Sequence, residues 1–177
     1  AITDLTIGET VTFGIVVNFI DGTTDNVVIT DQLPFAPGAL QYVSAGLAFV
    51  GADLTAGGGG PVTLPAPVLT DTNGDGVIDR VVLNFGTIVN AADVRPVPDA
   101  DDQMVVGITA RVLNLLPAPP AAPGTEANQD GMLLTNTATV TATGVGPLVD
   151  TAQVEVVEPD LNITKDAAPP VVDGGDT

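Results

Sequence analysis

An acidic segment near the middle of the chain has the residue types and spacing of a calcium-binding loop. In DTNGDGVIDR, residues 71 to 80, oxygen-bearing groups recur at alternate positions, and Gly76 permits a sharp turn between them. Calcium takes about six to eight hard oxygen ligands from a flexible loop, and this spacing can bring several together. The candidate ligands are Asp71, Asn73, Asp75, the carbonyl of Val77, and Asp79.

The loop does not match an EF-hand. Its twelfth position holds Val82 instead of a bidentate glutamate, and the flanking stretches PVLT and VVLNF have the composition of strands. We therefore expect a calcium loop framed by β-structure, with a dissociation constant on the order of 10⁻⁴ to 10⁻³ M, as in extracellular modules. The alternative is an ordinary acidic turn that binds no metal.

A lysine, an asparagine and an aspartate could together form a covalent cross-link. Lys165 is the only lysine of the chain, and in the strand-like stretch LNITK it shares the parity of Leu161 and Ile163. Asn136 and Asp31 likewise fall on the apolar parity of the stretches around them. Alternate residues of a strand lie on one face, so all three side chains are expected to point inward.

Burial gives this trio the properties that an amide bond between Lys165 and Asn136 requires. A buried lysine loses its proton readily, so a neutral amine becomes available to attack the asparagine carboxamide. Apolar surroundings raise the pKa of the Asp31 carboxyl, so that it can protonate and polarise the carboxamide. The reaction would release one ammonia and happen once per molecule, so it would be a maturation step and not enzymatic turnover. The alternative places the Lys165 ammonium in water at a strand end.

The composition argues against an enzyme. The chain has no His and no Cys, so the usual base, thiol nucleophile and transition-metal ligands are missing. Glycosidase sites usually present aromatic platforms, and there is no Trp and one Tyr. The net charge of −18 disfavours nucleic acid and anionic membranes and attracts divalent cations. No apolar run is long enough to span a bilayer, so any export signal or anchor is expected outside this segment.

The elements that must position these residues are strands. Apolar residues recur with period two, Thr and Val are frequent, and turn signals separate the runs, which together predict a β-sandwich. Proline-rich stretches at 89–102 and 115–131 are expected to be surface loops, and the acidic cluster after Pro98 to be solvated charge. The expected strands are 11–19, 26–31, 40–45, 62–70, 80–88, 103–113, 133–143 and 149–157.

Four ordered stretches resemble the Ig-like repeat domain of prokaryotic surface proteins and the related isopeptide-forming domains of fimbrial shafts. They are GETVTFGIVVNF, NVVITDQLPFAPGALQYVSAG, LTNTATVTATG and PDLNITKDAAPPVVDGGDT. The resemblance implies an Ig-like antiparallel β-sandwich over residues 1–158. It also implies that 159–177 is an exit segment that forms the first strand of the next repeat or subunit. It implies cross-linking roles for Lys165 and Asn136, and more weakly for Asp31.

A short internal match agrees with this division. The sequence GDT at 175–177 corresponds to GET at 8–10, a period of 167 residues. The segment 159–177 would then complete the sheet of a neighbour by strand addition, either within one tandem array or between separate subunits. In both cases Lys165 would meet Asn136 of the following repeat. The alternative is that the C-terminal segment is a flexible linker.

The function expected from these features is that of an extracellular or cell-surface structural repeat. Its partners would be identical repeats joined head to tail in a fibre, sheath or surface layer, which Thr-rich outward strand faces and an acidic, calcium-stiffened surface would suit. The alternative is an adhesive or ligand-binding module of a surface stalk, whose contacts would come from the two proline-rich loops.

Overall fold

Strands are the main secondary structure of the described residues, as the period-two pattern predicts. The computed structural model describes residues 3–35, 38–92, 99–114, 128–158 and 163–164. A 3-10 helix, η1 (Ala100–Asp102), precedes β8. The strands are β1 (Thr3–Leu5), β2 (Thr10–Asn18), β3 (Gly22–Gln32), β4 (Leu40–Val50), β5 (Leu54–Ala56), β6 (Val68–Thr70), β7 (Arg80–Asn90), β8 (Gln103–Val112), β9 (Leu133–Ala142) and β10 (Val145–Val156).

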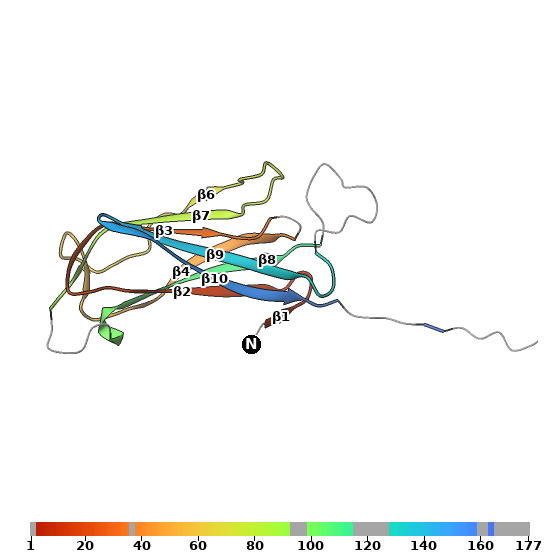
Figure 1. Cartoon of the computed structure of the whole chain (residues 1–177), viewed down its shortest axis with the longest axis horizontal. Helices are drawn as coiled ribbons and strands as arrows, with labels where there is room; N and C mark the ends of the chain where they lie inside the picture. Colours follow the sequence, from red (N-terminus) through yellow and green to blue (C-terminus); the bar gives the residue numbers. More distant parts are fainter. Residues whose placement is uncertain (1–2, 36–37, 93–98, 115–127, 159–162, 165–177) are drawn as a thin grey trace, which may run out of the picture.

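Two sheets pack face to face as a sandwich (Figure 1). The large sheet has the order β1-β10-β9-β3-β7-β5, with β6 also paired to β7, and the small sheet has the order β2-β8-β4. Neighbouring strands are antiparallel except for β1 and β10, which are parallel. The all-β sandwich predicted from the sequence is therefore confirmed.

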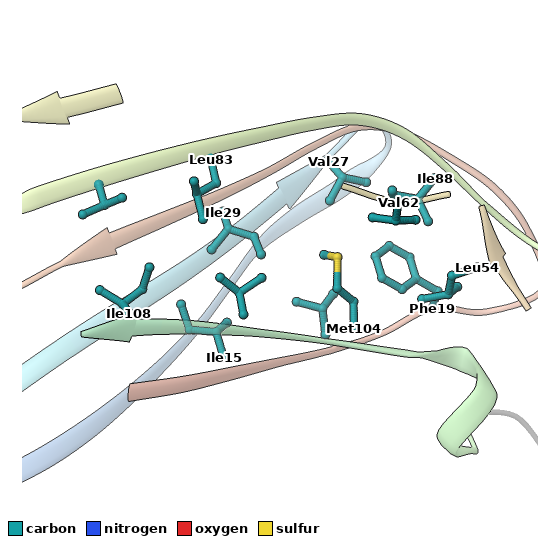
Figure 2. Packing of buried hydrophobic residues seen from close by; sticks show 13 residues of the cluster. Ile15, Phe19, Val27, Ile29, Leu54, Val62, Leu83, Ile88, Met104 and Ile108 are labelled. Atoms are coloured by element: carbon teal, nitrogen blue, oxygen red, sulfur yellow. The ribbon is translucent and has the colours of Figure 1, made fainter. Parts of the chain in front are cut away.

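The core forms between the sheets because each long strand places alternate side chains inward. On β2 the residues Phe13, Ile15 and Val17 are buried, while the residues between them are exposed. Figure 2 shows how side chains of the two sheets meet, with Met104 and Ile108 of β8 facing the large sheet. Burying apolar surface in this way supplies the main stabilisation of the fold, at roughly 25 cal/mol per Å².

On one side of the sandwich, each sheet has a strand with a free edge among the described residues. Among the strands that the structure describes, β2 of the small sheet pairs only with β8. In the large sheet β1 covers the edge of β10 only at residues 154–156. Residues 145–153 of β10 are all exposed.

Several strand boundaries differ from the sequence prediction. The stretch 62–70 is a strand only at its end, β6, and prolines at 61, 65 and 67 explain this because proline cannot donate to a strand ladder. The short strands β1 and β5 were not predicted. The expected loop at 89–102 is shortened by β7, which extends to Asn90, and by η1. Most of the second expected loop, 115–127, lies outside the described residues.

Candidate functional site

Asp31 and Asn136 form a buried side-chain pair between two adjacent strands. Asp31 lies on β3 opposite Ala138 of β9, which makes Asn136 its diagonal neighbour on the same face. The Asn136 amide Nδ2 donates to Asp31 Oδ1 at 2.9 Å and to Oδ2 at 3.3 Å. The two side chains are 1% and 3% exposed. The inward orientation predicted for both residues is therefore confirmed.

Asp31 has a raised pKa, and one polar atom of Asn136 has no described hydrogen-bond partner. Burial raises the pKa of the Asp31 carboxyl to about 6, and the hydrogen bond from Asn136 offsets part of that rise. The other polar atom of Asn136, Oδ1, is buried and has no hydrogen-bond partner among the described residues. A buried acceptor without a partner is costly, so this position favours an incoming donor.

A groove runs beside this pair along the open side of the sandwich. Its volume is about 430 Å³. We call it the β2–β10 groove. It is lined by residues 13–18 of β2, by Asn136, Ala138 and Val140 of β9, and by residues 148–152 of β10. The groove thus lies between the free edge of β2 and the exposed part of β10, and Asn136 forms part of its wall.

The third member of the proposed trio, Lys165, lies outside the described residues. Just before it, Ile163 and Thr164 are described and belong to no strand. Ile163 is 88% exposed, which makes it the most exposed of the large apolar side chains in the described part of the chain. The structure therefore brings together Asp31 and Asn136, whereas it does not place Lys165.

The acidic loop at 71–79 curls around Asp71. The carboxylate of Asp71 accepts hydrogen bonds from the backbone amides of Gly74 at 2.7 Å, Gly76 at 2.8 Å and Asp75 at 3.3 Å. These bonds, that from Gly76 above all, hold the pKa of Asp71 below its usual value. The Asp75 carboxylate accepts from the side-chain amide of Asn73 and from the backbone amide of Val77.

Asp79 has a structural role in the same loop. It is fully buried, and its carboxylate accepts from the backbone amide and the hydroxyl of Thr72. Its carbonyl accepts from the amide of Leu33, which ties the loop to the end of β3. Among the described residues, no group of three or more acidic side chains is arranged to hold a metal ion. Calcium binding by this loop therefore remains a prediction from the sequence.

A second buried amide and carboxylate pair was missed by the sequence analysis. Asn90 Nδ2 donates to Asp102 Oδ1 at 2.8 Å and to the carbonyl of Phe19, and Asn90 Oδ1 is buried without a described partner. Asp102 also accepts from the backbone amide of Asp99 in a capping box around η1. The prediction that this acidic cluster is solvated charge is wrong for Asp102, which is 3% exposed. The spacing from Asp99 to Asp102 could have indicated the cap.

The comparisons with known proteins identify no family. No protein-family model matches the chain, and no curated protein matches it. None of the described residues forms a helix long and apolar enough to cross a membrane.

Proposed function

We propose that this protein is a structural repeat of an extracellular prokaryotic fibre, sheath or surface layer, of the Ig-like surface-repeat type, and that it assembles head to tail by strand addition. The observation that carries the proposal is the β2–β10 groove, which lies beside the free edges of β2 and β10. An extended segment of a neighbouring copy would pair with the free edge and fill the groove with alternate side chains.

The two edges of the small sheet differ in a way that favours β2 as the acceptor. The register between β2 and β8 runs without interruption from Thr10 to Asn18. On the opposite edge, β4 pairs with β8 through two irregularities, at Tyr42/Ser44 and Leu47/Phe49. Bulges disturb an edge and discourage further pairing, whereas a regular edge accepts it.

The buried pair beside the groove supports a cross-link as part of this assembly. A neighbour's lysine amine would attack Cγ of Asn136, forming the new amide bond as the bond from Cγ to Nδ2 breaks. The amine proton passes to the departing nitrogen, which leaves as ammonia. Asp31, hydrogen-bonded to Nδ2 and with a pKa of about 6, is suited to carry that proton. The lysine would be Lys165 of the preceding copy.

Calcium would stiffen the acidic loop in the same assembly. Residues 71, 73, 75, 77 and 79 would supply oxygens to a weak site, and each carboxylate keeps lone pairs beyond its present hydrogen bonds. External calcium at millimolar concentration would be sufficient.

Assembly is tested by changing the exposed end of the chain. Ile163→Asp should weaken head-to-tail association by about a hundredfold or more, because an apolar side chain is replaced by a charge that would have to be buried. Thr164→Asp is the matched control, since it adds the same charge at the next residue, whose side chain would point away from the groove. Both positions are exposed in the single domain, so its melting temperature should not change. Association is measured by analytical ultracentrifugation, and equal assembly by both variants would contradict the proposal.

The cross-link is tested by mass spectrometry of assembled material boiled in denaturant. A branched peptide that joins Lys165 to Asn136, lighter by one ammonia, is the expected product. Asn136→Ala should remove the product and leave noncovalent assembly intact. Unmodified masses throughout, from material that dissociates completely on boiling, would refute the cross-link while leaving strand addition in place.

A further inference from the structure

We infer the identity, direction and register of the strand that fills the β2–β10 groove. It is Leu161–Lys165 of a second copy of this chain, and it runs antiparallel to β2 with Lys165 at the Phe13 end. The inference rests on the proposed assembly and goes further, because it determines whether a copy can fill its own groove.

The direction follows from the path of the chain around β1. β1 runs parallel to β10 and ends at Leu5. A turn then reverses the chain, in which the amide of Glu9 donates to the carbonyl of Thr6 and the Glu9 carboxylate accepts from the amide of Thr6. Gly8 occupies the left-handed region there, with φ of 88°. β2 therefore runs opposite to β1 and to β10.

The short match between GDT at 175–177 and GET at 8–10 aligns the incoming strand with the position directly before β1. The correspondence of Gly175 with Gly8 aligns residue 168 with residue 1, so Lys165 precedes that position by three residues. A strand that leads so closely into β1 runs in the direction of β1. It is therefore antiparallel to β2.

This direction brings Lys165 to Asn136 Oδ1, the acceptor in this groove that lacks a described hydrogen-bond partner. Phe13 and Asn136 line the same groove, and Asn136 Oδ1 is the buried acceptor without a described hydrogen bond. Pairing Lys165 with Phe13 places its side chain inward at Asn136. In the reverse direction Lys165 would fall opposite Val17, about 13 Å farther along the strand.

The inward positions of the incoming strand are then all matched by apolar positions of β2. Ile163 falls opposite Ile15, and Leu161 falls opposite Val17. The intervening residues, Asn162 and Thr164, point outward opposite Val16 and Gly14. Val16 is 54% exposed and a side chain at Gly14 would meet nothing within 4 Å, so both outward positions have room.

A copy cannot fill its own groove in this direction. The strand would have to begin beside Leu148, which lies ten residues before Glu158 along an extended chain, a span of about 33 Å. The three residues from Glu158 to Leu161 reach about 10 Å. The strand therefore comes from a second copy, which is either the preceding repeat of one polypeptide or a separate subunit. Since donor and acceptor surfaces differ, the contact propagates head to tail.

The absence of cysteine from the chain permits a direct test by disulfide trapping. Two acceptor variants, Val16→Cys and Gly14→Cys, are isotopically labelled and mixed with two donor variants, Asn162→Cys and Thr164→Cys. Strand neighbours are close enough for a disulfide. We expect bonds between labelled and unlabelled chains for positions 16 with 162 and 14 with 164, exceeding the crossed pairs by about tenfold or more.

Each other outcome overturns the inference in a distinguishable way. Predominance of positions 16 with 164 and 14 with 162 would show the reverse direction. Assembled copies without any of these bonds would show that the strand does not pair with β2. Closed dimers trapped reciprocally would exclude head-to-tail growth. If the copies do not associate at all, the proposed function itself fails.

Discussion

Asp31 and Asn136 form a buried pair that combines a raised carboxyl pKa with an amide oxygen that has no described hydrogen-bond partner, and Asn90 Oδ1 shares only the second property. Asp79 is enclosed as completely, but Thr72 donates to its carboxylate twice. Within the described part of the chain, Asp31 receives hydrogen bonds from a single amide group, and burial raises its pKa to about 6. A carboxyl that exchanges its proton near neutral pH is well suited to assist one slow amide exchange.

The raised pKa of Asp31 predicts how stability depends on pH. Because the pKa is about 6 in the folded chain and near 3.8 when unfolded, the folded chain binds more protons between these values. The free energy of unfolding should therefore fall by about 2 to 4 kcal/mol as pH rises from 4 to 7. Asp31→Asn should remove this decline and stabilise the protein at pH 7.5, since the new amide can also donate to Asn136.

The measurement is urea unfolding at several pH values. Asp21→Asn is the control, because it removes the same charge from an exposed turn and should keep the decline. A decline that persists in Asp31→Asn would contradict the assignment to Asp31.

Parity alone was sufficient to predict that these two side chains point inward, because the alternation of a strand is a local property. It could not predict that they touch. They are 105 residues apart in the chain and meet only because β3 pairs with β9.

At the scale of elements, the small sheet has one regular and one irregular edge. The bulged strand β4 ends at Val50, and the amide of the next residue, Gly51, donates to the carbonyl of Gln103. A Cβ on Gly51 would overlap the backbone carbonyl of Asp101. This close approach holds the end of β4 against the segment that leads into β8.

Gly51→Ala should therefore destabilise the domain by about 1 to 3 kcal/mol, because the backbone at Asp101 must move. Gly46→Ala, in the same strand, is the matched control, since nothing lies within 4 Å of its Cβ position. It should be neutral or stabilise by up to about 1 kcal/mol. The measurement is chemical unfolding, and equal effects at both positions would show that the close approach is not limiting.

The short strands β1, β5 and β6 are the elements that the sequence pattern predicted poorly. β1 and β5 are each three residues long, too short for a period to be recognised. β6 follows a stretch whose apolar residues look strand-like. Val62 in that stretch is buried in the core without belonging to a strand, because apolar burial and ladder pairing are separate requirements.

The whole molecule carries a net charge of −18, so two copies in the proposed assembly would repel each other. The proposed strand insertion would overcome this repulsion with backbone pairing and apolar contact, which salt affects little. Divalent cations lower the repulsion generally, and a calcium-specific effect would have to arise at a site.

Calcium should raise the melting temperature by about 2 to 5 °C at several millimolar, given a dissociation constant near 10⁻⁴ to 10⁻³ M. The shift in melting temperature with magnesium at the same concentration measures the general effect of a divalent charge. Asp75→Asn should lose the difference between the two ions, whereas Asp21→Asn should retain it. If calcium and magnesium raise the melting temperature of the unmodified chain equally, the loop is an acidic turn without a calcium site.

The sequence by itself determined the all-β class, the inward parity of Asp31 and Asn136 and the absence of histidine and cysteine chemistry, because periodicity and composition are carried by local residues. Only the tertiary structure decided which strands are neighbours. The groove along β2, the unpartnered Oδ1 of Asn136 and the unequal edges of the small sheet follow from nonlocal pairing. Pairing depends on how distant strands share one core, and no local pattern encodes it.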